Sequence, residues 1–277
     1  MQSNSRVFVN HLLGVDTLLF DDTNTGRLTI AVGLNGGLVH QFREAIMEGK
    51  NVFETMRSYT SSAGSVVFCM DEHLDRLARS AELLSVIMPD KNILVAEIAQ
   101  IAAGDSSIRV TLGERGARLV ESYPMDFSRV GRPVTVGTYE VADEPEFPSI
   151  AKHGFRSAWS DSASSQGVDE VLLVSSRGEI LEANNSNVFA VIGGQIVTPP
   201  LDGRQLAGVT RRRIIEVALG MGLQVQERSL LLSEHFDELF LTSSLKEVAP
   251  VYSVCGKRLR AGSLTATLHQ GFSQLYI

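Results

Sequence analysis

The sequence predicts an α+β fold built from two domains. Stretches with the alternation of half-buried strands and stretches with helical periodicity follow one another without the regular strand–helix order of a doubly wound sheet. Residues 139–148 (YEVADEPEFP) are acidic, contain two prolines and separate two halves that each show clear periodicity. The 277 residues are 44% hydrophobic, which provides apolar side chains for a core in each half. We therefore expect domains at 1–138 and 149–277, joined by a linker at 139–148.

The first half contains two expected strands and one helix. Residues 47–59 and 65–68 alternate as strands around the turn-forming residues 61–64. Residues 71–84 follow as an amphipathic helix that places Leu74, Leu77, Ala81 and Leu84 on one stripe, with Asp71 as its expected N-cap.

The second half mixes short strands with helices. Residues 171–174, 188–192 and 195–198 have the composition of strands and are separated by glycine-containing turns. Residues 207–219 form an expected helix that ends near Gly220. Residues 223–231 are expected to be extended, 233–239 to form a short helix, and 240–241 to form a strand that leads into residues 242–244.

Composition and charge exclude several classes of function. The net charge of −7 argues against nucleic acid as the main partner, because phosphate binding needs a basic surface. No apolar run reaches the ~18 residues of a membrane span, and the N-terminus lacks a signal-peptide pattern. Cys69 and Cys255 lie far apart and form neither a disulfide framework nor a metal motif. We therefore expect a cytoplasmic protein with no membrane, nucleic-acid or metal partner.

Four local features suggest chemistry, although each is weak on its own. Lys152 is followed by His153 and Arg156, whose positive charges would favour a neutral, nucleophilic amine. Glu182 lies in a run of small and amide residues between two strands, where a carboxylate can be held facing a cationic nitrogen. Gly208, Val209 and Thr210 begin a helix whose free amides suit an anion, and hydroxyl groups cluster at residues 242–244. Each feature also has an interpretation without function: in the same order, these are a surface lysine, an exposed turn, a capped helix and a polar turn.

Together these residues form the set that pyridoxal 5′-phosphate requires: an amine, a carboxylate for the pyridinium and two anchors for a phosphate. Their order and local sequence resemble the class IV aminotransferases, the fold type IV group that includes D-amino acid aminotransferase, branched-chain aminotransferases and aminodeoxychorismate lyase. Residues 49–57 (GKNVFETMR) are similar to the family's GDGVFETIR strand, and residues 72–77 (EHLDRL) to its EHxxRL helix. The other matching stretches are 151–156, 167–173, 181–189, 206–211 and 240–244.

The resemblance implies a D-amino acid aminotransferase-like fold and a role for each matched residue. Lys152 would be the catalytic lysine, Arg76 would bind the cofactor phosphate, and Glu182 would face the pyridine nitrogen. Further cofactor contacts would come from Arg156, Gly208, Val209, Thr210, Ser243 and Ser244. Substrate contacts would come from Phe53 and from either Arg115 or Arg118. The resemblance also implies a homodimer.

The sequence departs from the family pattern in four places, one of which is the loop at 113–119, shorter than the family's RGxGxRG-type stretch. The stretch between Lys152 and Gly167 is a few residues shorter than usual, so that a gapless count back from Gly167 reaches Ser149. We assign the lysine position to Lys152 because His153 and Arg156 follow it in the family's pattern. Lys50 and Asn51 replace the usual Asp-Gly pair, and residues before Met47 match poorly.

The expected activity is transfer of an amino group between an amino acid and a 2-oxo acid. One alternative is 4-amino-4-deoxychorismate lyase, which releases pyruvate and p-aminobenzoate; the lysine segment resembles that branch, whereas the VFETMR strand favours the aminotransferases. The other alternative is a family member without catalytic activity, suggested by the shortened segment after the lysine.

Overall fold

A computed structural model describes residues 5–10, 17–22, 27–32, 39–62, 64–142, 147–260 and 262–276. The chain divides into two compact units. Unit 1 comprises residues 1–126 and 151–154, and unit 2 comprises residues 127–150 and 155–277. None of the described helices is long and apolar enough to cross a membrane.

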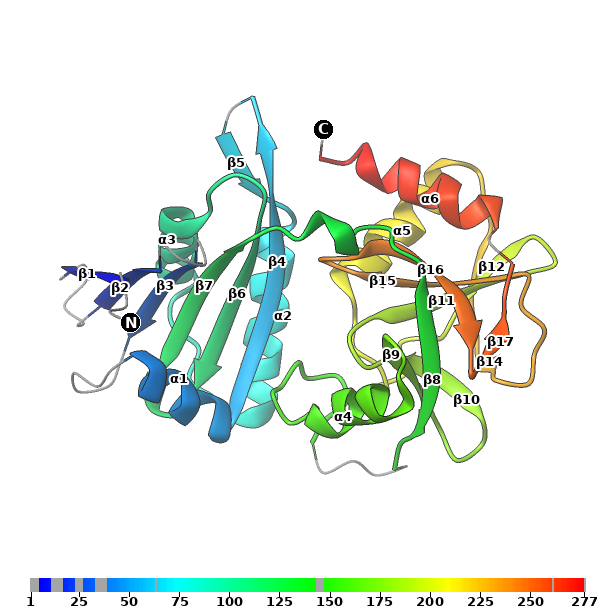
Figure 1. Cartoon of the computed structure of the whole chain (residues 1–277), viewed down its shortest axis with the longest axis horizontal. Helices are drawn as coiled ribbons and strands as arrows, with labels where there is room; N and C mark the ends of the chain where they lie inside the picture. Colours follow the sequence, from blue (N-terminus) through cyan, green and yellow to red (C-terminus); the bar gives the residue numbers. More distant parts are fainter. Residues whose placement is uncertain are drawn as a thin grey trace. The chain divides into compact units, whose positions relative to one another are not determined.

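In its described part, unit 1 contains one antiparallel sheet with helices packed on it (Figure 1). The strand order is β1-β2-β3-β7-β6-β4-β5. The strands are β1 (Ser5–Asn10), β2 (Thr17–Asp22), β3 (Arg27–Val32), β4 (Asn51–Ser61), β5 (Gly64–Val67), β6 (Ser106–Gly113) and β7 (Arg118–Pro124), and the helices are α1 (Val39–Glu48), α2 (Met70–Leu84) and α3 (Lys91–Ile101).

The two faces of β4 have different neighbours. Val52, Met56 and Ser58 are fully buried on the face that packs against α2, whose inward residues include Leu74 and Leu77. The alternate residues, beginning with Phe53, point to the opposite face because side chains alternate along a strand. This alternation separates the apolar core of unit 1 from a polar face of the same sheet.

In the described residues, unit 2 is built on a longer mixed sheet with the order β13-β12-β11-β15-β16-β8-β9-β10-β14 and β17 paired to β16. Its parallel pairs are β8–β9, β8–β16 and β12–β13. Its helices are α4 (Ser157–Gln166), α5 (Val209–Gly220) and α6 (Ser263–Ser273). Its strands are β8 (Val134–Glu140), β9 (Glu170–Val174), β10 (Glu179–Ala183), β11 (Asn187–Ile192), β12 (Gln195–Thr198), β13 (Val225–Glu227), β14 (Leu230–Leu231), β15 (Glu238–Ser243), β16 (Glu247–Val254) and β17 (Lys257–Arg258).

The apolar core of unit 2 lies within this sheet. Every residue of β9 is buried, and Phe189 of β11 stacks on Phe240 of β15 with 5.0 Å between ring centroids. Buried aliphatic side chains from β8, β9, β10 and β16 form a hydrophobic cluster in the same sheet. The ends of β10, β11 and β15 carry several of the candidate site residues, and the packing of this core holds them in place.

The structure agrees with the expected α+β class and differs from some expected elements. Met47 and Glu48 belong to α1, so that the strand expected from residue 47 starts at Asn51. Cys69, with φ 52°, occupies the N-cap of α2, and Asp71 lies in the first turn. No helix forms over 233–239, because Glu238 and Leu239 already pair with β11 as part of β15.

The division into units also differs from the expected linker at 139–148. The chain passes into unit 2 after Asp126 because β8 pairs with β9 and β16 in the second sheet. Residues 143–146 of the expected linker lie outside the described residues. Residues 151–154 then return to unit 1, which makes unit 1 discontinuous in sequence.

Candidate active site

The Lys152 segment is attached to unit 1 through its backbone. The Phe53 N–H donates to the Lys152 carbonyl at 3.0 Å, and Val52 and His153 form an isolated antiparallel bridge. The Lys152 N–H donates to the Ser80 hydroxyl of α2 at 3.0 Å. Because β5 pairs only with the last residues of β4, the first part of this strand edge is left for residues 151–154. The lysine is therefore held on two secondary-structure elements.

Asn51 and Gly154 make a close contact beside this lysine. Asn51 is fully buried and donates through Nδ2 to the carbonyls of Met47 and Gly49, at 3.3 and 3.0 Å. A Cβ atom at Gly154 would lie 2.4 Å from Asn51 Oδ1, so a side chain at position 154 would require the asparagine to move. Asn51 of the unusual Lys50-Asn51 pair is therefore the first residue of β4 and also packs tightly against the lysine segment.

Phe53 contacts two cations on the face of the sheet opposite α2. Lys152 Nζ lies 5.0 Å from the Phe53 ring centroid, and the Arg109 guanidinium lies 3.8 Å from it. Such contacts are attractive because the ring face carries a partial negative charge. The structure therefore brings the predicted residues Phe53 and Lys152 together and adds Arg109.

Arg109 was not among the sequence candidates. It makes one long hydrogen bond, from Nε to Thr111 Oγ1 at 3.3 Å, and no ion pair with any described residue. Burial lowers the pKa of Arg109 below its ordinary value, and the charge of Glu121 opposes this only in part. A desolvated guanidinium without a carboxylate partner is suited to binding an anion. The sequence did contain one signal that could have indicated Arg109: it is a charged residue between Ile108 and Val110 in a strand with alternating side chains.

Arg76 is paired with a carboxylate on the α2 side of the sheet. Its Nε and Nη2 atoms donate to the two oxygens of Glu54 at 2.6 and 2.7 Å, and His73 Nδ1 lies 2.8 Å from Glu54 Oε2. All three side chains are buried. Burial lowers the pKa of His73, so the ring is neutral at pH 7 and donates its Nδ1 proton to the ionised Glu54. Glu54 therefore fixes the orientation of the guanidinium that is expected to bind a phosphate.

The two sequence candidates for a substrate-binding arginine lie in different environments. Arg118 is buried and donates through Nε and Nη2 to Glu97 of α3, with a shortest distance of 2.6 Å. Arg115 is exposed and adopts φ 58° in the turn between β6 and β7. Arg118 thus has a structural carboxylate partner already, and Arg115 faces solvent.

In unit 2, Glu182 is buried and its carboxylate is hydrogen-bonded. Its Oε2 atom accepts from the Leu206 N–H at 3.1 Å and from Asn187 Nδ2 at 3.3 Å. Arg156 Nη1 lies 3.7 Å from Oε1. The pairing of β10 with β9 shifts register between Ile180 and Glu182, and such bulges redirect side chains near functional sites. The expectation of a buried, oriented carboxylate thus agrees with the structure.

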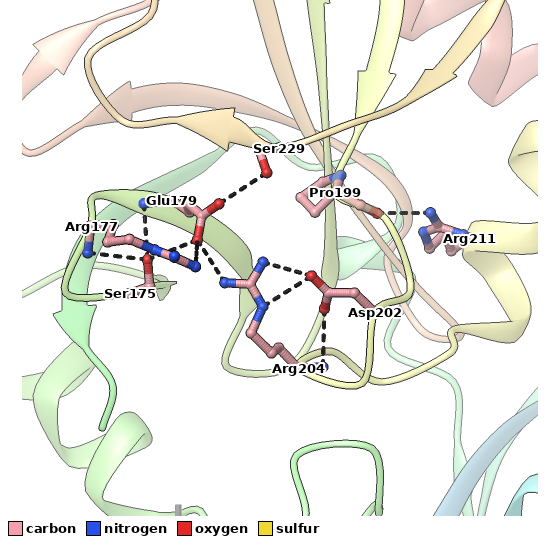
Figure 2. Close-up of polar contacts among 8 residues, drawn as sticks. All are labelled: Ser175, Arg177, Glu179, Pro199, Asp202, Arg204, Arg211 and Ser229. Atoms are coloured by element: carbon pink, nitrogen blue, oxygen red, sulfur yellow. Dashed lines mark hydrogen bonds and ion pairs between the residues drawn. The ribbon is translucent and has the colours of Figure 1, made fainter. Parts of the chain in front are cut away.

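The start of α5 lies against Asn187. Gly208 is the N-cap, and no side chain caps the first amides of this helix, those of Val209 and Thr210. A Cβ at Gly208 would lie 1.8 Å from Asn187 Oδ1, so glycine is required at this contact. Arg211, in the first turn of α5, is buried and donates to the Pro199 carbonyl at 2.9 Å (Figure 2).

Hydroxyl groups at the end of β15 lie close to the same asparagine. Thr242 pairs directly with Asn187 between β15 and β11. Ser243 ends β15 and Ser244 begins the turn that follows; both are half-buried, and Ser243 Oγ accepts from the Lys246 N–H at 3.3 Å. The predicted residues Gly208, Val209, Thr210 and Ser243 therefore belong to elements that meet around Asn187.

The residues of unit 2 fit a polar cofactor. The hydroxyl of Thr242 and both amide atoms of Gln205 are buried and have no hydrogen-bond partner among the described residues. Buried polar groups usually pair, so these atoms, with the uncapped amides of α5, indicate a missing polar partner. A phosphate at the helix start and a pyridine nitrogen at Glu182 would provide such partners.

Comparisons with known proteins identify the family and the fold. The family model for amino-transferase class IV matches residues 51–254. A branched-chain-amino-acid aminotransferase of Escherichia coli is 29% identical over 86% of this chain and 88% of its own. A probable one from Rickettsia felis is 30% identical over 80% and 86%. A crystal structure of the Escherichia coli enzyme superposes with a TM-score of 0.74, at 26% identity over 82% of this chain and 86% of that one.

The fold and these residues define an enzyme of the fold type IV group. The chain belongs to the class IV aminotransferases. It is a pyridoxal-phosphate-dependent enzyme that transfers an amino group between an amino acid and a 2-oxo acid.

Proposed function

We propose that Lys152 holds the cofactor and moves the proton during transfer. The observation that carries this proposal is the fixed backbone of residues 151–154 on β4 and α2, which keeps Nζ over the Phe53 ring. A lysine held in this way can serve as nucleophile and then as general base. Ser149, the position reached by the gapless count, belongs to unit 2 and uses its carbonyl to accept from Arg156 at 3.0 Å.

When bound, pyridoxal phosphate supplies the electron sink and carries the amino group between the two half-reactions. Glu182 would keep a proton on the pyridine nitrogen, because its carboxylate is oriented by hydrogen bonds from Asn187 and the Leu206 amide. Arg156, which approaches the same carboxylate, lies near the phenolate oxygen in this proposal. Its guanidinium position is supported by the Ser149 carbonyl and by Trp159, whose ring centroid lies 4.8 Å away.

The cofactor phosphate is bound by the amides that begin α5 and by nearby hydroxyls. The Gly208 cap leaves the Val209 and Thr210 amides available, and the helix dipole favours an anion there. Ser243 and Ser244 add donors in this proposal, and Arg76, oriented by Glu54, adds charge.

We propose Arg109, in place of Arg115 or Arg118, as the group that binds the side-chain carboxylate of a dicarboxylic substrate. It shares the Phe53 ring with Lys152 and has no ion-pair partner among the described residues. Phe53 offers an apolar surface beside this charge, so a branched-chain amino acid and a dicarboxylic partner can both be accommodated. The names of the relatives support a branched-chain substrate.

The proposal is tested by amino-group transfer with Arg109→Gln. We expect KM for a dicarboxylic substrate to rise roughly 10- to 100-fold, because a charge-assisted hydrogen bond is lost, with a smaller change for leucine, isoleucine or valine. Steady-state assays across donors and 2-oxo acids measure this, with Arg115→Gln as the exposed control. Equal effects of the two variants would contradict the role of Arg109, and absence of transfer from every donor would contradict the substrate proposal.

We also propose that the enzyme is a cytoplasmic homodimer, as the family resemblance implies. Both described cysteines, Cys69 and Cys255, are free, which agrees with a reducing compartment. Sedimentation of purified protein is expected to give twice the chain mass. A single-chain mass at micromolar concentration would contradict the homodimer.

A further inference from the structure

Two carboxylates of β10 bond the loop that leads into α5. Glu182 accepts from the Leu206 amide at 3.1 Å, and Glu179 Oε2 accepts from Arg204 Nη1 at 2.6 Å. Residues three apart in a regular strand point to opposite faces, but the register shift between Ile180 and Glu182 allows both carboxylates to reach one loop. The loop and the strand are therefore joined at two positions.

All three guanidinium nitrogens of Arg204 donate hydrogen bonds to carboxylates (Figure 2). Its Nε and Nη2 atoms donate to Asp202 Oδ2 at 3.0 and 2.6 Å, while Nη1 donates to Glu179. Ser229 Oγ donates to the other oxygen of Glu179 at 2.9 Å. Hydrogen bonding by Arg204, and then by Ser229, lowers the pKa of Glu179 to about 2, so the carboxylate stays ionised near neutral pH.

The loop has little packing on the side of Arg204. Gly203 and Arg204 line a cavity of about 610 Å³ together with Val141, Pro148 and Leu181, all within unit 2. Because the guanidinium of Arg204 is fully engaged with carboxylates, it is not available to bind an anion in this cavity. The polar contacts of Arg204, rather than apolar burial, therefore fix the loop on this side.

We propose that Arg204, held by Glu179 and Asp202, is a positioning residue for the cofactor site. It lies two residues before Leu206, whose amide orients Glu182, and shortly before Gly208, which begins α5. By fixing this loop it sets the carboxylate that faces the pyridine nitrogen and the amides that bind the phosphate. This inference rests on the proposed roles of Glu182 and α5.

The test compares Arg204→Gln with Arg177→Gln. Arg177 Nη2 also donates to Glu179, at 3.1 Å, but it belongs to the β9–β10 turn and makes no hydrogen bond or ion pair with the described residues of the loop, so it is a matched control. In protein without cofactor, we expect hydrogen exchange of the Leu206 amide to quicken about fivefold in Arg204→Gln, as expected for the loss of a partly exposed ion-pair network. Arg177→Gln should exchange like the wild type.

The same variants are then titrated with pyridoxal phosphate. We expect Arg204→Gln to raise the dissociation constant about fivefold and to move the nitrogen NMR signal of isotope-labelled cofactor toward that of an unprotonated pyridine. Arg204→Lys, which keeps one ion pair, should fall between this variant and the wild type.

Three results would overturn the inference: unchanged Leu206 exchange in Arg204→Gln, the same cofactor affinity and nitrogen signal as Arg177→Gln, or a lower melting temperature with neither property changed. A wild-type protein that takes up no cofactor would contradict the proposed function instead. The exchange measurement would still decide whether Arg204 fixes the loop.

Discussion

Replacing Lys152 with alanine is expected to lower turnover by about 10⁴-fold or more, because the proposed mechanism uses this one side chain as nucleophile and as general base. General acid–base catalysis alone contributes about 10²- to 10⁴-fold, and the loss of covalent attachment adds to it. The backbone contacts of residue 152 to Phe53 and Ser80 do not involve the side chain, so the variant should remain folded. Initial rates of transfer, with the thermal unfolding of both proteins, measure the effect.

Lys50→Ala is the matched control for this experiment. Lys50 lies close in space to the lysine segment, since the next residue, Asn51, contacts Gly154, but its own side chain is exposed. We expect its turnover to stay within about twofold of the wild type. Comparable losses in the two variants, or substantial turnover by Lys152→Ala, would contradict the assignment.

Replacing Glu54 with glutamine is expected to lower the free energy of unfolding by about 3–5 kcal/mol. The substitution leaves the Arg76 guanidinium buried without its carboxylate, and breaking a buried ion pair from one side costs about this much. His73 loses the same ionised acceptor. Denaturant unfolding measures the change, and Glu114→Gln, at an exposed carboxylate of the β6–β7 turn, should stay within about 0.5 kcal/mol of the wild type.

The wild type should lose the same contribution on acidification. Burial alone would raise the pKa of Glu54, but the charge and hydrogen bonds of Arg76, joined by those of His73, hold it well below its usual 4.5. A carboxyl group whose pKa is lower in the folded state stabilises the fold above pH 4.5, and this contribution is lost as the pH falls below it. Glu54→Gln should therefore depend less on pH in this range, and an equal acid dependence would contradict the role of Glu54.

Local patterns in the sequence were sufficient for several elements. The helix expected at 71–84 corresponds to α2, and strands 188–192 and 195–198 lie within β11 and β12, because each is a short segment with clear periodicity. The helix at 233–239 was wrong, because pairing of β15 with β11 outweighs a weak local preference. Parallel pairing of β8 with β16 likewise joins residues far apart in sequence. It places β8 in unit 2, whereas most of these residues were expected in the first domain.

Among the candidate site residues, too, some are indicated by a local sequence pattern and others depend on contacts between residues distant in sequence. Glu182 and the start of α5 could be found because a local pattern of small residues and glycine accompanies each. The partners of the arginines could not be found in this way: Glu54 lies 22 residues before Arg76, and Glu97 lies 21 before Arg118. Arg109 was missed for a related reason: its proposed role as an anion-binding group rests on the absence of an ion-pair partner among the described residues, which the sequence does not reveal.

The central claim is that Lys152 carries the cofactor, and the most direct measurement is reduction of the purified enzyme with borohydride after loading with pyridoxal phosphate. Mass spectrometry of peptides then locates the modified residue. We expect the visible absorption band to disappear on reduction and the phosphopyridoxyl group to be found on Lys152, with no modification in Lys152→Ala. A modification on another lysine, or well-folded protein that takes up no cofactor, would contradict the account.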